Sequence, residues 1–93
     1  MIRTVHVSIA GYVQGVGYRA WTVKAANRRG LSGWVRNRRD GSVEAVFSGE
    51  AALIDEMLEA CRSGPPAAAV ESVTIEDQPG EHPEPGFRAL TTI

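Results

Sequence analysis

Valine and isoleucine alternate with polar residues over positions 4–9 of the chain. This period of two is typical of a β-strand with one buried face. Residues 31–37 and 43–48 predict two more strands, and the Asp40-Gly41 pair between them is a strong signal for a hairpin turn. We therefore expect three strands in the first half of the chain, two of them joined as a hairpin.

Two segments show helical spacing instead. Within residues 18–29, the side chains of Tyr18, Trp21 and Ala25 fall on one face, and a glycine follows in a position common after helix ends. Residues 53–61 place five apolar side chains on one face and charged side chains on the other, until a Gly-Pro-Pro sequence ends the pattern. These segments predict two helices, one on each side of the hairpin.

Residues 70–76 predict a fourth strand, and residues 87–90 predict either a short edge strand or a tail. The order strand-helix-strand-strand-helix-strand with short connections is typical of the split βαβ arrangement. A chain of 93 residues can bury only one two-layer core. We therefore expect a single α+β domain over residues 1–93, with an antiparallel sheet that carries both helices on one face.

The charges are sorted along the chain, although they sum to only −1. Residues 1–39 carry eight Lys and Arg and no acid, whereas residues 40–93 carry all eleven acids and two arginines. The total argues against a nucleic-acid partner, while the first segment attracts anions unless the two segments neutralise each other on folding. The single cysteine, Cys61, excludes an internal disulfide, and no apolar run is long enough for a signal peptide or membrane span. We expect a monomeric cytoplasmic protein with no membrane or nucleic-acid partner.

Residues 11–19 read GYVQGVGYR and lie between the first predicted strand and the first predicted helix. The three glycines let the backbone turn tightly and approach a ligand closely. The first N–H groups of the helix are free to bind an anion, and Arg19 offers a planar fork of donors. This combination predicts a binding site for a phosphoryl group.

Two nucleotide-binding motifs fit this loop poorly. A P-loop counted from Gly11 would need a glycine and a lysine where Val16 and Gly17 stand. The segment Gly15–Ala20 matches the dinucleotide fingerprint G-x-G-x-x-G/A, and Asp40 follows at about the expected distance. That acid belongs to the hairpin signal, however, and the chain lacks the alternating β-α units of a dinucleotide-binding fold.

A second block, residues 33–44, reads GWVRNRRDGSVE. The two blocks together closely resemble the two signatures of the acylphosphatases, and the resemblance in organisation extends over nearly the whole chain, although residues 87–93 depart from the family's usual closing strand. It implies a ferredoxin-like βαββαβ sandwich, in agreement with the predicted order of elements. It also implies a hydrolase that cleaves the carboxyl-phosphate bond of acyl phosphates, giving a carboxylate and inorganic phosphate, which would compete with the substrate.

The resemblance implies a role for residues in both blocks. It assigns the side chain of Arg19 to phosphate binding and the side chain of Asn37 to positioning the attacking water. The loop backbone completes the phosphate site through Gln14, Gly15, Val16, Gly17 and Tyr18. It implies no metal and no other cofactor.

The residue types suit this chemistry. An acyl phosphate already has a good carboxylate leaving group, so the enzyme needs mainly to hold the phosphoryl group, offset its charge and aim a water in line. Asn37 can orient a water but cannot remove a proton at neutral pH, so we expect a rate that varies little across neutrality and does not respond to chelators. His6 and His82 lack a third metal ligand, and Cys61 lies on an apolar helix face, where packing is its expected role.

One alternative stays open from the sequence, namely a module on the same fold that binds acyl phosphate, carbamoyl phosphate or RNA without hydrolysing anything. The N-terminal domains of hydrogenase-maturation proteins look similar to such a phosphate-binding module. RNA binding is disfavoured because its signature is absent, and because Glu44 stands in a strand that would contact the bases.

Overall fold

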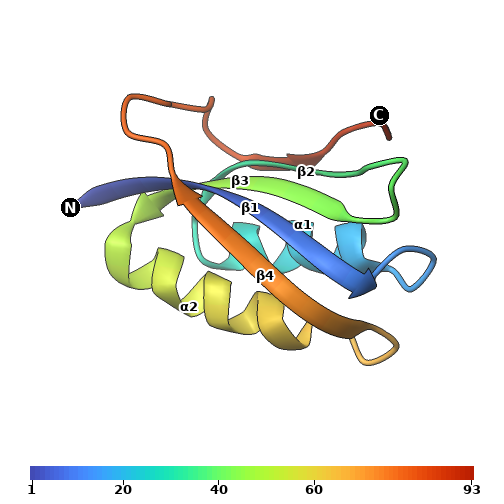
Figure 1. The fold of residues 1–93 in the computed structure, drawn as a ribbon. Helices are drawn as coiled ribbons and strands as arrows, with labels where there is room; N and C mark the ends of the chain where they lie inside the picture. Colours follow the sequence, from blue (N-terminus) through green and yellow to red (C-terminus); the bar gives the residue numbers. More distant parts are fainter.

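The computed structural model describes residues 1–93, and its strands form one sheet with two helices packed on one face (Figure 1). In chain order the elements are β1 (Ile2–Tyr12), α1 (Tyr18–Arg28), β2 (Ser32–Asn37), β3 (Val43–Glu50), α2 (Ala51–Ser63), β4 (Ala69–Asp77) and β5 (Phe87–Ala89). The predicted strands and helices are confirmed, and residues 87–89 form an edge strand. Neither helix has the length and hydropathy needed to cross a lipid bilayer.

The five strands are ordered β4-β1-β3-β2-β5 across the sheet. β1 pairs with β3 and β4, and β2 pairs with β3, all in antiparallel orientation as predicted. β5 pairs with β2 in parallel, so the prediction of a purely antiparallel sheet is wrong at this edge. The physical reason is the connection between β4 and β5. Residues 78–86 pass over the helix-free face of the sheet, where the Thr4 hydroxyl donates a hydrogen bond to the Glu81 carbonyl at 3.0 Å (Figure 1). Because of this path the chain enters β5 in the same direction as β2.

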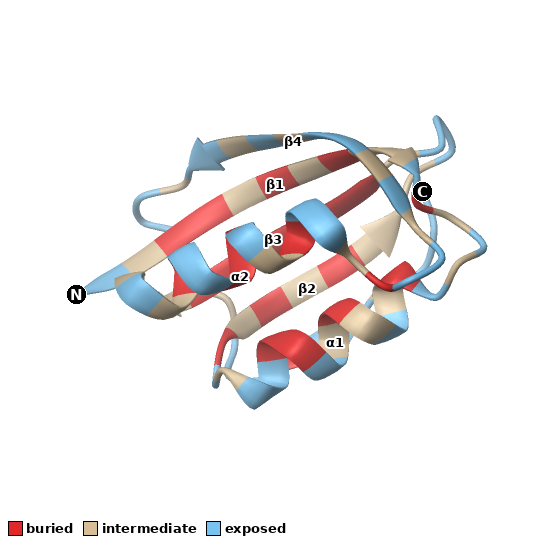
Figure 2. Ribbon diagram, turned by 90° about the horizontal axis from the view of Figure 1, so that it is seen from below, coloured by how far each residue is buried: buried red, intermediate tan, exposed pale blue.

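The core lies between the sheet and the two helices (Figure 2). The predicted alternation in β1 is confirmed, because Val5, Val7 and Ile9 are completely buried. Phe47 of β3 stacks on Phe87 of β5, with ring centroids 5.2 Å apart. Full burial of a side chain of this size contributes roughly 1.5–3 kcal/mol, so the short β5 is held in place largely by its first residue.

Helix α1 packs through a slightly different face from the one predicted. Tyr18 and Ala25 are buried as expected, but Trp21 is only partly buried, whereas Thr22 and Ala26 are completely buried. Thr22 can be buried because its hydroxyl donates to the carbonyl of Tyr18 at 2.8 Å. Small side chains therefore let this helix lie close to the sheet, and the wide indole is displaced to the margin of the core.

The helix-free face of the sheet contains a buried carboxylate, Glu44 of β3, which is 6% exposed. It accepts hydrogen bonds from His6 Nε2 (2.6 Å) and Arg36 Nε (2.8 Å), and Arg38 Nη1 lies 3.3 Å away. Burial opposes ionisation of this group, but the hydrogen bonds from His6 and Arg36 outweigh burial and hold the pKa of Glu44 below its usual range. The basic and acidic segments of the sequence thus neutralise each other at this face.

Candidate active site

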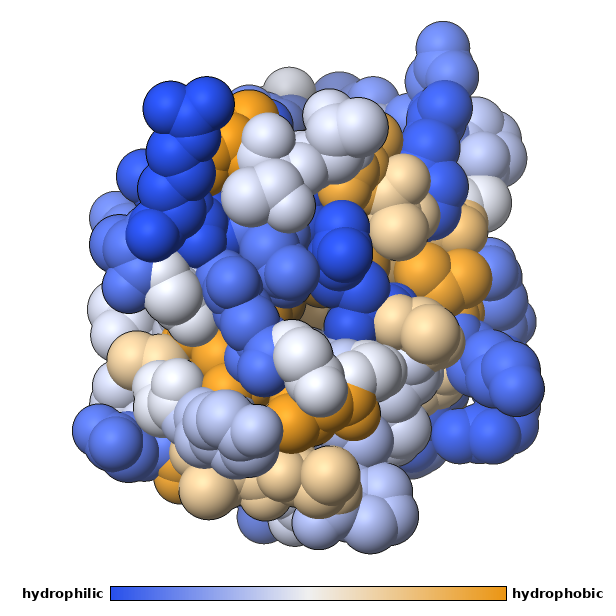
Figure 3. Space-filling model, turned by 90° about the vertical axis from the view of Figure 1, so that its right-hand side faces the viewer, coloured by the Kyte–Doolittle hydropathy of each residue, from blue (hydrophilic) through white to orange (hydrophobic).

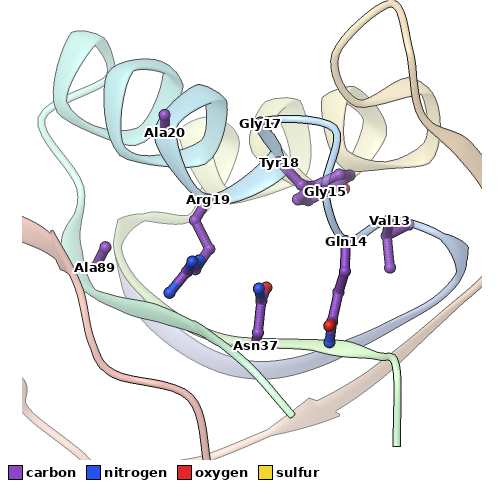
Figure 4. A pocket seen from close by; sticks show the side chains of 9 residues that line it. All are labelled: Val13, Gln14, Gly15, Gly17, Tyr18, Arg19, Ala20, Asn37 and Ala89. Atoms are coloured by element: carbon purple, nitrogen blue, oxygen red, sulfur yellow. The ribbon is translucent and has the colours of Figure 1, made fainter. Parts of the chain in front are cut away.

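A cavity of about 360 Å³ lies where the loop after β1 meets the start of α1 (Figure 4). Four segments line it: the loop, the first turn of α1, the end of β2 and the strand β5. The lining residues are Val13, Gln14, Gly15, Gly17, Tyr18, Arg19, Ala20, Asn37 and Ala89. The fold therefore brings the two sequence blocks together at one cavity.

The loop backbone depends on two glycines. Gly15 and Gly17 have φ angles of 75° and 80°, in the left-handed region that side chains disfavour. A Cβ atom at either position would meet nothing within 4 Å. Glycine is thus required here for its backbone conformation and not for lack of space, and such turns direct successive N–H groups toward one point.

The N–H groups of residues 14–20 donate no hydrogen bond within the protein, and Trp21 is the first residue of α1 to do so, to the Gly17 carbonyl at 3.0 Å. No side chain caps this helix, and Gly17 occupies the N-cap position. Free N–H groups together with the positive end of the helix dipole form a binding site for an anion.

Arg19 extends from the first turn of α1 into the cavity (Figure 4). Its Nη1 donates to the Leu90 carbonyl at 3.4 Å, and the Leu90 N–H in turn donates to Val35 of β2 at 2.8 Å. A guanidinium has five N–H donors, so this single long hydrogen bond leaves most of them free for a ligand. The contact sets the direction of the side chain without using its capacity to bind an oxyanion.

Asn37 is the last residue of β2 and approaches the cavity from the sheet side, opposite Arg19 (Figure 4). Its carbonyl accepts a hydrogen bond from the Ile93 N–H at 3.2 Å, and Arg39 donates its own N–H to the Ile93 carbonyl at 2.7 Å. The chain after β5 therefore holds the backbone at Asn37 in place. The carboxamide of Asn37 makes no hydrogen bond within the protein, and it points toward Arg19 and the loop.

The side chains of three predicted phosphate-binding residues are engaged elsewhere in the protein. Tyr18 is 2% exposed, its hydroxyl donates to the Cys61 carbonyl at 2.6 Å, and burial raises the pKa of Tyr18. Val16 packs against the core and does not line the cavity. Gln14 directs its amide away from the loop, to the β2–β3 hairpin. Only backbone groups of these residues can take part in the predicted phosphate site.

The lining of the cavity contains one cation, Arg19, and no acid. Four cations of the N-terminal half have no carboxylate within ion-pairing distance, namely Arg19 and, outside the cavity lining, Lys24, Arg28 and Arg39. Figure 3 views the end of the molecule where the loop and the β2–β3 hairpin lie, and it shows hydrophilic side chains around a central hollow. An arginine without an acidic partner at such a hollow favours the approach of an anion.

Ala89 and Leu90 could not be predicted as neighbours of the site, because the position of β5 depends on a long connection with no local signal. Ala20 was also missed, and it lines the cavity because it follows Arg19 in the first turn of α1. Cys61 is buried on α2, where burial raises its pKa to about 12, so its predicted packing role is confirmed. No group of three or more His, Cys, Asp and Glu side chains has the arrangement of a metal site. Metal independence itself stays a prediction.

Comparison with known proteins agrees with this geometry. The sequence profile of the family described as Acylphosphatase matches residues 5–89. An acylphosphatase of Azorhizobium caulinodans is 55% identical over 95 residues, covering 100% of both chains. The structure of an acylphosphatase from Coxiella burnetii superposes with a TM-score of 0.91 at 38% identity, over 96% of this chain and 93% of that chain. The acylphosphatase from Bacillus subtilis gives a TM-score of 0.91 at 30% identity, over 97% and 99%.

The fold is thus a ferredoxin-like α+β sandwich, and its cavity presents the kinds of donor that a phosphoryl anion requires. The chain belongs to the acylphosphatase family. The predictions of this family, of the ferredoxin-like fold and of an enzyme that hydrolyses acyl phosphates are confirmed. A small acyl phosphate is its substrate, and inorganic phosphate is one of its products.

Proposed function

We propose that hydrolysis takes place in the cavity between the loop, α1 and β2, with separate groups for binding and for attack. The loop N–H groups and Arg19 hold the phosphoryl group, and Asn37 orients the water. The observation that carries this proposal is the convergence of unused donors: the N–H groups of residues 14–20 have no acceptor, and both side chains point into the same space.

Phosphoryl binding rests on charge as well as on hydrogen bonds. The three oxygens of a transferring phosphoryl group carry spread negative charge, which positioned donors stabilise in the transition state. The guanidinium of Arg19 supplies a full positive charge and a planar set of N–H donors. The loop N–H groups add the partial positive charge of the α1 start.

Attack requires a water on the side of the phosphorus atom opposite the acyl oxygen. The carboxamide oxygen of Asn37 accepts a hydrogen bond from this water and so directs its lone pair. A bond then forms between the water oxygen and phosphorus, while the bond between phosphorus and the acyl oxygen breaks and releases a carboxylate. The proton lost by the water passes to an oxygen of the phosphoryl group, because neutral asparagine cannot accept it.

The test of the binding half compares two arginines on one helix. Arg19→Ala should lower kcat/KM for benzoyl phosphate by about 10- to 100-fold and weaken inhibition by inorganic phosphate, because a hydrogen bond to a charged group contributes roughly 1.5–3 kcal/mol. Arg28→Ala removes an exposed arginine of α1 that has no acidic partner, and should change neither quantity. Equal effects of the two substitutions would show that Arg19 acts only through net charge.

We also propose that the chain works as a cytoplasmic monomer without nucleic acid. The helix-free face of the sheet, which this fold offers to bases in RNA-binding modules, buries Glu44 and is crossed by residues 78–86. Light scattering on the purified protein should give the mass of one chain, and a mobility-shift assay with single-stranded RNA should show no complex. A stable dimer or a retarded RNA would overturn this part.

A further inference from the structure

Gln14 belongs to the phosphate loop by sequence, but its side chain leaves the loop. Its Nε2 donates to the Arg38 carbonyl at 2.7 Å and to the Ser42 carbonyl at 2.8 Å. Both carbonyls lie at the base of the β2–β3 hairpin, where Arg38 and Ser42 also hydrogen-bond to each other through the Arg38 N–H (2.9 Å). One amide group thus uses both of its N–H bonds to fasten the loop to the hairpin.

The base of the hairpin, where Gln14 is bound, is adjacent to Asn37, the residue proposed to orient the water. Asn37 immediately precedes Arg38, so the hydrogen bonds of Gln14 fix the distance between the loop N–H groups and the Asn37 carboxamide. The two halves of the site come from different elements. Figure 4 shows the Gln14 side chain extending from the loop toward the end of β2, and its hydrogen bonds join the loop to the hairpin there. Small displacements matter here, because misplacement of a reacting group by about 1 Å can cost on the order of 100-fold in rate.

We propose that Gln14 is a positioning residue, whose side chain sets the alignment of the Asn37-bound water with the phosphoryl group held by the loop. This inference rests on the roles proposed above for Arg19 and Asn37. It differs from a role in phosphate binding, because the side-chain donors of Gln14 are fully used by the hairpin and are not available to the ligand. Loss of these hydrogen bonds should therefore lower kcat and leave phosphate affinity nearly unchanged.

Gln14→Met tests this directly, because methionine keeps the length of the side chain and removes both donors. We expect kcat for benzoyl phosphate to fall about 10-fold or more, while the inhibition constant for phosphate changes less than about twofold. The control is Thr4→Val, which also removes two side-chain hydrogen bonds, to Ser48 and to the Glu81 carbonyl, but on the helix-free face. This control should lose stability without losing turnover.

Gln14→Glu adds a readout that a purely structural role would not move. The ionised carboxylate of this variant has no hydrogen-bond donor for the carbonyls of Arg38 and Ser42, whereas its protonated form has one O–H donor. At a temperature well below unfolding, kcat of this variant should rise as the pH falls toward 5, while wild type and Gln14→Met should show no such rise.

A double-mutant cycle separates failure of this inference from failure of the proposed function. In the Asn37→Ala background, Gln14→Met should lower the remaining turnover less than about twofold, because there is no aligned water left to misplace. Full turnover in Gln14→Met would overturn the positioning role alone. The same conclusion would follow if the fold-loss of turnover in the double variant equalled the product of the two single fold-losses. Full turnover in the single variants Arg19→Ala and Asn37→Ala would instead overturn the roles of these two residues, on which the inference rests.

Discussion

At the scale of single residues, the site depends on backbone conformation more than on special side chains. Gly15 and Gly17 adopt positive φ angles in open space, and the N–H groups that follow them have no acceptor in the protein. A Cβ atom would fit sterically at either position, but an L-residue would oppose the left-handed conformation. The glycines thus hold the loop in the shape that an anion requires.

Gly15→Ala should therefore destabilise the protein by about 1 kcal/mol and weaken phosphate binding, since relief of the strained φ would turn the loop N–H groups away from a common point. Gly80 is the matched control. It has a φ of 91°, and a Cβ atom there would also meet nothing within 4 Å. It lies in a turn of the connection between β4 and β5, away from the phosphate loop. Gly80→Ala should lose similar stability in a thermal melt without changing the dissociation constant for phosphate. Equal phosphate affinity in both variants would contradict this account of the loop.

At the scale of elements, the start of α1 is fixed by a contact with α2. The Tyr18 hydroxyl donates to the Cys61 carbonyl in the last turn of α2, where carbonyls lack partners within the helix. Tyr18 also packs its ring so closely beneath Gly64 that a Cβ atom there would lie 2.5 Å from it. The phosphate loop is therefore held between the helix layer and, through Gln14, the hairpin.

Tyr18→Phe should lower the free energy of unfolding by about 1–2 kcal/mol, because the buried Cys61 carbonyl loses its donor. In a domain of this size, such a loss corresponds to a fall in Tm of roughly 4–15 °C. Turnover at a temperature below the transition should change little, because only the backbone of Tyr18 faces the cavity. A large fall in kcat with unchanged stability would show that the phenol acts in the reaction.

Those parts of the fold and of the candidate site that depend on local chemistry could be predicted from the sequence. The loop and Asn37 are candidates from the sequence because each lies within one continuous block, and their roles stay proposals. β1 and the hairpin were predictable because their spacing is regular. The parallel pairing of β5, the Arg19 contact with Leu90 and the lining by Ala89 were not predictable, since they follow from a nine-residue connection over the sheet. Burial of Thr22 in place of Trp21 depends on how closely α1 approaches the sheet, which apolar spacing does not reveal.

At the scale of the whole molecule, charge contributes to stability and to function at different places. Cations pair with acids on the helix-free face, around Glu44, whereas Arg19 stays free of acids at the cavity. The enzyme should consequently show acid-sensitive stability but a nearly pH-independent reaction.

The acid sensitivity has a defined sign. The pKa of Glu44 in the folded protein lies below its ordinary value of 4.5, so its contribution to stability is fully present above that pH and is lost as the pH falls through the folded-state value. Glu44→Gln should flatten part of the fall in unfolding free energy below about pH 4.5, as measured by urea denaturation. Glu59→Gln alters an exposed carboxyl and should leave the acid dependence as in the wild type.

The reaction should behave differently, because neither a guanidinium nor a carboxamide changes its charge near neutrality. We expect kcat to vary less than about twofold between pH 6 and 8, and to be unaffected by a chelator such as EDTA. A bell-shaped profile centred near pH 7 would require a titrating protein group in the reaction. Loss of activity with the chelator, restored by a divalent cation, would contradict metal independence.

The most direct test of the division between binding and attack is Asn37→Ala, assayed for both activities in one preparation. The dissociation constant for inorganic phosphate should stay within about twofold of the wild type, while turnover of benzoyl phosphate should fall by on the order of 100-fold or more. Unchanged turnover in a folded Asn37→Ala variant would contradict the account. So would a loss of phosphate affinity as large as the loss of turnover.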